Sequence, residues 1–235
     1  MKTEHISSAF DTDLEEVQAL IMKMGGLVEN AIHQGMQSLE TRDEELAQTV
    51  RAADAEIDAL EETINEGAAR IIALRAPTAI DLRLVLSVIK ISGNLERIGD
   101  YAKNMAKRTE VLSQAAPVRD STGTLRRMTL AVEGMLKDAL DAYIHRDVAL
   151  AADVIARDVD VDQMYNALFR ELLTFMMEDP RNITASLHLH FIAKNTERMG
   201  DHVTSIAEQV VYLATGKHPD EARPKADTTA TAGQA

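Results

Sequence analysis

One seven-residue pattern occurs twice in this chain and constrains its fold more than any other feature. Residues 94–100 and 195–201 both read N-x-E-R-[IM]-G-D, and the second copy begins 101 residues after the first. In a chain of 235 residues, a repeat at this distance predicts two similar halves. Both copies lie in stretches with helical spacing of apolar residues. The glutamate and aspartate of each copy therefore share one helix face.

The composition predicts an all-α protein and excludes several classes of function. Aromatic residues make up only 3% of the chain, whereas the helix-forming residues Ala, Leu, Glu, Ile and Met are plentiful. The net charge of −13 argues against nucleic acid as a partner, because phosphate backbones are bound by basic surfaces. The absence of cysteine excludes disulfides, thiolate metal sites and cysteine nucleophiles.

The location of the protein follows from what the sequence lacks. Residues 1–8 do not form a signal peptide, and no apolar run approaches the roughly 18 residues of a membrane span. We therefore expect a soluble, cytoplasmic protein without direct membrane insertion.

Helical periodicity, interrupted at each of the five prolines, predicts six long helices. Short breaks between helices of this length favour antiparallel packing. We expect two pseudo-symmetric antiparallel three-helix bundles, at residues 1–115 and 116–217, and a disordered tail at 218–235. A single six-helix assembly is the alternative. The expected helices span residues 13–39, 43–74, 78 to about 114, 125–144, 148–177 and 180 to about 215. Leu74, near the end of the second, is expected to point inward.

Local signals mark several helix ends. Thr41 and Thr78 each precede an acidic residue by three positions, which predicts that they cap the second and third helices. Pro180 suits the first position of the sixth helix, and Gly216 is a plausible helix terminator.

The apolar stripe of the third helix runs directly into the first acidic pair. Leu82, Leu86 and Ile89 follow helical spacing, and Glu96 and Asp100 continue the same steps. This pattern predicts a polar site where the buried seam reaches the rim of the bundle.

A second acidic set lies on the preceding helix of each half. Positions equidistant from the turn of an antiparallel hairpin are level, and Asp58 precedes Pro77 by as many residues as Glu96 follows it. Each half should therefore gather four carboxylates. These are Asp54, Asp58, Glu96 and Asp100 in the first half, and Asp158, Asp162, Glu197 and Asp201 in the second. Glu61 and Asn104 are further candidates, and Ser205 takes the place of Asn104 in the second half.

Four carboxylates at one level need neutralisation. Oxygen ligands suit hard cations such as magnesium, calcium, manganese or oxidised iron. The alternative is neutralisation by Arg97 and Arg198 without any metal. Three functions stay open at this point: an adaptor, a metalloenzyme and a metal-free helical scaffold.

The histidines and methionines of the chain are weaker candidates for functional residues than the paired acids. His188 and His190 point to different helix faces and are expected to be packing or surface residues. The absence of a Glu-x-x-His motif weakens a ferritin-like di-iron site. Met22, Met24, Met176 and Met177 are expected to fill the core rather than to form a docking patch.

Beyond the paired acids, four further segments make the chain resemble the PhoU family. They are Met22–Gly26, Arg70–Arg83, Leu95–Asp100 and Thr174–Arg181. The resemblance implies a pair of three-helix bundles, a homodimer, and multinuclear metal clusters of iron, manganese, magnesium or another hard cation. The implied ligands are the eight acids of the two clusters, with Glu61 and Asn104 as weaker candidates.

The resemblance also implies signalling rather than catalysis. A PhoU-like protein would be a negative regulator of the phosphate-starvation response. It would link the phosphate ABC transporter, through its ATPase subunit PstB, to the sensor kinase PhoR.

Overall fold

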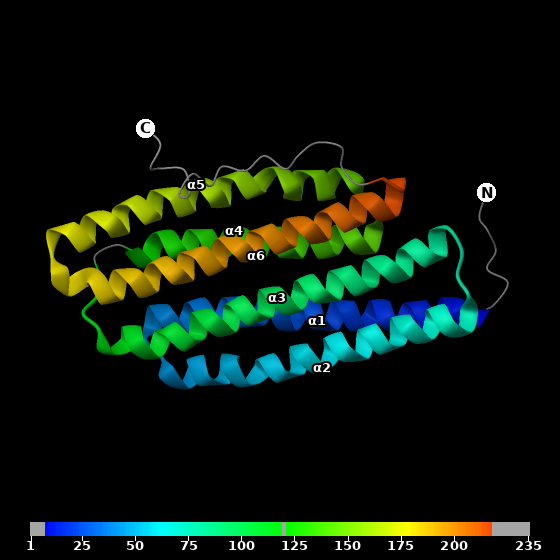
Figure 1. The fold of residues 1–235 in the computed structure, drawn as a ribbon, viewed down its shortest axis with the longest axis horizontal. Coiled ribbons are helices and arrows are strands. Elements are labelled where there is room, and N and C mark those ends of the chain that lie inside the picture. The colour runs from blue at the N-terminus through cyan, green and yellow to red at the C-terminus, as the bar shows by residue number, and fades with distance from the viewer. Residues whose placement is uncertain (1–7, 119–120, 218–235) are drawn as a thin grey trace.

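The structure is a computed structural model that describes residues 8–118 and 121–217. The described chain is helical throughout, with no strand in these two ranges (Figure 1). The predicted all-α class is therefore confirmed. The elements are α1 (Ser8–Thr41), α2 (Glu44–Arg75), α3 (Ile80–Gln114), α4 (Ser121–His145), α5 (Val148–Glu178), the short 3-10 helix η1 (Pro180–Asn182) and α6 (Ile183–Thr215).

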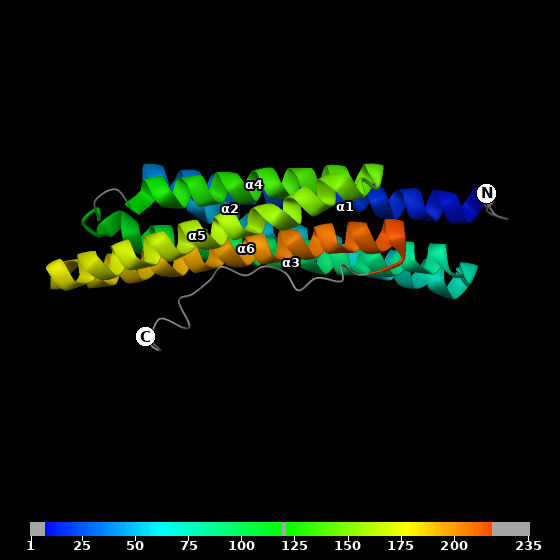
Figure 2. The same ribbon diagram turned by 90° about the horizontal axis from the view of Figure 1, so that it is seen from above.

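The helices form two antiparallel three-helix bundles that lie side by side. Helices α1, α2 and α3 pack against one another, and so do α4, α5 and α6. The bundles join along their length, α3 against α6 and α1 against α4 (Figures 1 and 2). Both copies of the repeated motif lie on the two helices, α3 and α6, that form the larger of these contacts. None of the described helices is long and apolar enough to cross a bilayer.

The buried stripe of α3 differs from the one that we predicted. The buried residues of α3 include Leu84, Val88 and Ile91, whereas Leu86 is 42% exposed. Because α3 packs against α1, α2 and α6 together, its buried face is wide. The stripe through Leu86 runs along the edge of that face. The acids of the motif therefore continue a half-exposed edge and not the buried seam.

Two apolar residues that were expected inside lie outside. Leu74, expected to point inward on α2, is 66% exposed, and Met177, expected to fill the core, is 78% exposed. Both lie in the last turn of a helix that leads into a hairpin connection. Helical spacing alone does not show where packing against a neighbour ends.

Helix ends confirm one of the predicted signals and correct three others. Gly216 ends α6 in the left-handed region at φ 78°. Pro180 begins the 3-10 helix η1 behind an Asp179 cap, and α6 itself begins only at Ile183. Thr41, however, is the last residue of α1, and Asp43 caps α2 by accepting a hydrogen bond from the Leu46 N–H at 2.9 Å. Thr78 makes no side-chain cap.

Candidate functional site

The first acidic cluster joins α2 to α3 and consists of Asp54, Asp58, Glu61, Glu96 and Asp100. Asp54 is only 4% exposed, and Glu96 and Asp100 are partly buried. Burial of its carboxyl group raises the pKa of Glu96, and the nearby carboxylates of Asp100, Glu61 and Asp58 raise it further. Partial burial and the Asp54 carboxylate likewise raise the pKa of Asp58. The acids from both helices therefore lie within electrostatic reach of one another.

The glycine of each motif copy lets the two helices of a hairpin approach closely. A Cβ atom on Gly99 would lie 3.0 Å from Ile57 Cδ1 and 3.8 Å from Asp54 Oδ1. In the second half, a Cβ on Gly200 would lie 3.1 Å from Asp158 Oδ1. Glycine therefore suits both motif positions because a side chain of the neighbouring helix packs against the backbone, Ile57 at Gly99 and Asp158 at Gly200.

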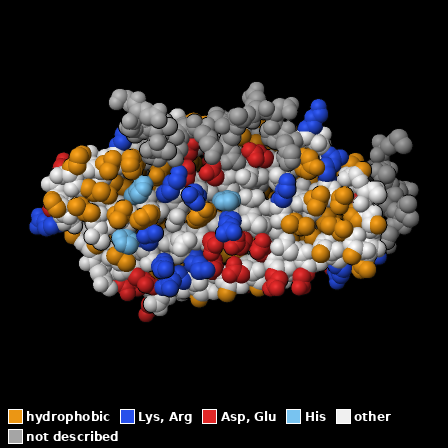
Figure 3. All heavy atoms as spheres, viewed as in Figure 1, with side chains coloured by type: hydrophobic (Ala, Val, Ile, Leu, Met, Phe, Trp, Pro, Cys, Tyr) orange, Lys and Arg blue, Asp and Glu red, His pale blue; other side chains and the backbone are white. Residues whose placement is uncertain are grey.

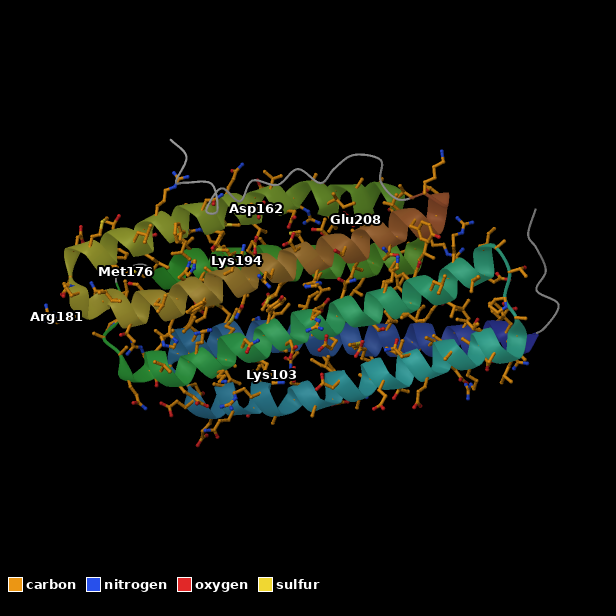
Figure 4. The ribbon with its side chains drawn as sticks, in the orientation of Figure 1. Lys103, Asp162, Met176, Arg181, Lys194 and Glu208 are labelled. Atoms are coloured by element: carbon orange, nitrogen blue, oxygen red, sulfur yellow. The ribbon has the colours of Figure 1, made fainter. Side chains whose placement is uncertain are left out.

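Lys103 neutralises part of the first cluster. Its ammonium group donates a hydrogen bond to Asp54 Oδ2 and lies 3.6 Å from Asp100 Oδ1. The hydrogen bond to Asp54 raises the pKa of Lys103, and the charges of the neighbouring acids add to this effect. Figure 4 shows Lys103 on α3 where it faces α2. Arg97 is more exposed and contributes weaker contacts, 3.4 Å to Glu96 and 3.8 Å to Asp100.

The second acidic cluster, on α5 and α6, is more deeply buried. It consists of Asp158, Asp162, Glu197 and Asp201, of which the first three are buried. Lys194 donates a hydrogen bond to Glu197 Oε1 at 2.8 Å, and its ammonium group lies 4.9 Å from the centre of the Tyr165 ring. Figure 4 shows Asp162 on α5 and Lys194 on α6. Each half therefore carries a lysine among its acids.

The two amide and hydroxyl candidates lie differently from the acids. Asn104 is exposed, and among the described residues no hydrogen bond joins it to the first cluster. Ser205 donates a hydrogen bond to the backbone carbonyl of Asp201 at 3.0 Å, which lies one turn earlier in the same helix.

Residues of the motif also join the two bundles. His202 Nδ1 lies 2.8 Å from Asn94 Oδ1, and Arg198 Nη1 donates to the Tyr101 hydroxyl at 3.4 Å. The hydrogen bond from Arg198 to Tyr101 raises the pKa of Arg198. The rings of Tyr101 and His202 lie 5.8 Å apart, centre to centre. The motif therefore has two functions, because its acids gather within a bundle while its other side chains hold the bundles together.

Sequence reasoning missed four residues of this region. Lys103 lies three residues after Asp100, and Lys194 lies three residues before Glu197, so helical spacing was a signal for both. Tyr101 and His202 directly follow the last acid of each motif copy. Tyr101 and His202 act in the contact between α3 and α6. The repeat predicts two bundles but does not predict which of their helices touch, so the role of these residues could not be inferred.

The donor set fits a hard cation in its chemistry, since both clusters offer carboxylate oxygens only. In the conformation described here, however, no three acidic or histidine side chains of residues 8–118 and 121–217 are placed to hold one metal ion. Lys103 and Lys194 contact these carboxylates instead. Arg198, which was considered as the neutralising group of the second half, donates to Tyr101. Metal binding stays a prediction, and it requires the lysines to withdraw.

Comparison with known proteins gives consistent relatives for the whole chain. A family model described as the PhoU domain matches residues 21–109 and 125–210. A protein of Caulobacter vibrioides named phosphate-specific transport system accessory protein PhoU homolog is 46% identical over 96% of this chain and 98% of its own length. A protein of Rhizobium meliloti with the same name is 44% identical over 99% of this chain and 98% of its own.

Two solved structures share the fold. The crystal structure of PhoU from Pseudomonas aeruginosa is 40% identical, with a TM-score of 0.86, and covers 88% of this chain and 100% of its own. The phosphate transport system regulatory protein PhoU from Streptococcus pneumoniae is 28% identical, with a TM-score of 0.81, and covers 90% of this chain and 100% of its own.

Proposed function

Because this chain belongs to the PhoU family, we propose that it is a negative regulator of the phosphate-starvation response. The observation that carries this proposal is the match over almost the full length of both chains to accessory proteins of phosphate-specific transport. In the proposed mechanism the protein is an adaptor without catalytic turnover. It links PstB, the ATPase of the phosphate ABC transporter, to the sensor kinase PhoR, and it restrains phosphate uptake. Since the ATPase acts on cytoplasmic ATP, the adaptor acts in the cytoplasm.

We further propose that both acidic clusters bind hard cations. The ligands of the first site would be Asp54, Asp58, Glu96 and Asp100, with Glu61 and Asn104 at its edge, and those of the second Asp158, Asp162, Glu197 and Asp201. Two observations support this. The same acid-and-glycine arrangement occurs in both halves, and burial raises the pKa of acids that a cation would stabilise in charged form. A bound cation would supply the positive charge that Lys103 and Lys194 contribute here.

Deletion of the gene tests the regulatory function. In a strain without it, alkaline phosphatase should be high even when phosphate is plentiful, and a plasmid copy of the gene should restore repression. Co-purification of PstB or PhoR with the full-length protein should follow, and light scattering should show a homodimer. Unchanged alkaline phosphatase after deletion would contradict the regulatory proposal.

Elemental analysis of protein purified without chelator tests the metal sites. We expect iron, manganese, magnesium or another hard cation. Combined Glu96→Ala and Asp100→Ala substitutions should lower the content by about half, because the second cluster remains. Glu62→Ala, an exposed acid on the same hairpin, is the matched control and should change nothing. A metal content that is equal in all three proteins would exclude the first cluster as a site.

A further inference from the structure

Large apolar side chains are exposed together at the end of the second bundle. Leu173 and Met177 lie four residues apart on α5, and Ile183, Leu187 and Phe191 repeat every four residues on α6. We call these five residues the end patch. Figure 3 shows hydrophobic side chains gathered over this end of the molecule, and Figure 4 shows the neighbouring Met176 and Arg181 at the turn. Exposed apolar patches of this kind mark contact surfaces on folded proteins.

Arg108 of α3 borders the end patch without a carboxylate partner. Its guanidinium group lies 4.3 Å from the centre of the Phe191 ring, and its Nη1 lies 3.3 Å from His188 Nδ1. The Arg108 Nε is buried without a hydrogen-bond partner, and no acid of the described chain forms an ion pair with this side chain. Burial lowers the pKa of Arg108, which shows that the charge is partly desolvated. A half-buried cation beside an exposed aromatic ring is suited to receive an anion.

The first bundle offers an internal comparison, because the repeat relates residues 101 positions apart. Leu86 corresponds to Leu187, and the two are equally exposed at 42% and 43%. Leu82 likewise corresponds to Ile183. Phe191 and Arg108 have no such counterpart, because Lys90 stands in the place of Phe191 and Gln209 in that of Arg108. On α2 and α5, where the paired acids lie 104 positions apart, Ala73 stands in the place of Met177 and Ala69 in that of Leu173. Met, aromatic residues and Arg are enriched at protein interfaces. Here Met177 and Phe191 lie at the end of the second bundle, Phe191 beside Arg108 of the neighbouring α3, whereas the corresponding positions are Ala, Lys and Gln.

We propose that the end patch and Arg108 form the docking surface for an amphipathic helix of a partner protein, whose apolar face covers the patch and whose edge carries a carboxylate that pairs with Arg108. Charge complementarity favours this occupant. The five residues of the patch and Arg108 contain no acid among them, so the carboxylate must come from the occupant. This inference rests on the proposed adaptor function for the existence of a protein partner, and adds where that partner binds.

Peptide binding to the full-length protein tests the surface directly. The probes are two synthetic amphipathic helices with the same leucine stripe, one with Glu and one with Lys beside it, followed by fluorescence anisotropy. The Glu peptide should bind about tenfold more tightly than the Lys peptide. Leu187→Ser should weaken the Glu peptide about tenfold, whereas the matched Leu86→Ser should not. Arg108→Met should remove the preference for Glu over Lys. Thermal unfolding of each variant confirms that it is folded. If Arg108→Met does not fold, Arg108→Gln, which also removes the charge, takes its place.

Four outcomes would overturn the proposal. They are the absence of peptide binding, equal binding of both peptides, an equal loss in Leu86→Ser and Leu187→Ser, and dissociation of a dimer by Leu187→Ser, which would show that a second copy occupies the patch. Binding to anionic vesicles that is lost in Leu187→Ser, without preference for the Glu peptide, would point to a lipid surface instead.

Complementation separates this inference from the regulatory proposal. In the deletion strain, Leu86→Ser should restore repression of alkaline phosphatase, and Leu187→Ser should not. Full complementation by both variants would overturn the docking surface alone. A deletion strain with unchanged alkaline phosphatase would instead refute the regulatory function.

Discussion

Two residue types, glycine and lysine, determine how the acidic clusters are built. Gly99 and Gly200 bring an aspartate of the neighbouring helix against the motif, and Lys103 and Lys194 balance the charge that results. The spacing of the acids along the sequence was sufficient to predict that Asp54, Asp58, Glu96 and Asp100 meet. The spacing of Lys103 and Lys194 from the acids of the motif was a signal as well. It could not predict that Lys103 reaches across to Asp54, because a lysine side chain reaches several alternative partners from one backbone position.

Removal of Lys103 should expose its role as an internal counter-ion. In Lys103→Met, the buried Asp54 loses its partner, and the metal-free protein should lose about 1–3 kcal/mol of unfolding free energy in urea titration. Manganese should bind more tightly to this variant than to the wild type, because the competing ammonium group is gone. Lys107→Met, an exposed position one turn further on α3, should match the wild type in both measurements. Weaker manganese binding by Lys103→Met would contradict the idea of competition.

The pH dependence of stability should report on Glu96. Its pKa is raised in the folded protein, so folding favours the protonated form. The associated stability is present below the ordinary pKa near 4.5 and is lost as the pH rises through the raised value. Metal-free Glu96→Gln should therefore melt at a higher temperature than the wild type at pH 7, and this advantage should shrink towards pH 4. The lost contact with Arg97 is exposed and has little weight. Glu62→Gln should show no such dependence, and a constant difference across the pH range would refute the assignment.

At the scale of helices, the sequence predicted the elements better than their ends. Apolar spacing and proline positions identified all six long helices, because each must bury one face over many turns. Capping depends on the backbone geometry of a single residue, which spacing does not determine. Asp43 and Asp147 provide the caps of α2 and α5, and in both cases the true cap lies next to the first helical residue. At the start of α3 the N-cap residue is Ala79, with φ 47°, and no side chain caps the helix.

Cap substitutions should separate true from apparent signals. Asp147 accepts hydrogen bonds from the Ala149 and Leu150 N–H groups at 2.9 and 3.0 Å. Asp43→Ala and Asp147→Ala should each cost about 1 kcal/mol of unfolding free energy. Thr78→Ala should cost much less, since its side chain makes no cap. Equal losses of unfolding free energy in all three variants would contradict this prediction, because they would show that the observed capping hydrogen bonds do not determine the loss.

For the whole molecule, the contact between α3 and α6 is what sequence reasoning did not foresee. The repeat predicted two bundles, yet it did not say how they pack. Polar residues of this contact are Asn94, Tyr101, Arg198 and His202, which belong to the motif or directly follow it. Arg198 is exposed and the other three are partly buried, so no hydrophobic pattern distinguishes them from a solvated helix face.

A double-mutant cycle should measure this contact between the bundles. Asn94→Ala and His202→Ala should each lower the unfolding free energy, and their combination should cost about 1 kcal/mol less than the sum of the two. Asn94→Ala combined with Asp147→Ala, which lies on a different part of the chain, should be additive. Additive behaviour of the first pair would mean that the hydrogen bond of 2.8 Å contributes no net stability.

The lysine inside each acidic cluster has a consequence for how the protein would respond to cation supply. A zinc finger that loses its ion loses its fold, because nothing else compensates the ligands. Here the chain provides its own replacement cation, so the helices keep their places whether or not an ion is bound. If the clusters bind cations as we propose, ion occupancy would be free to vary with conditions in the cell and to serve as information, because the lysines would replace the charge of an ion that leaves.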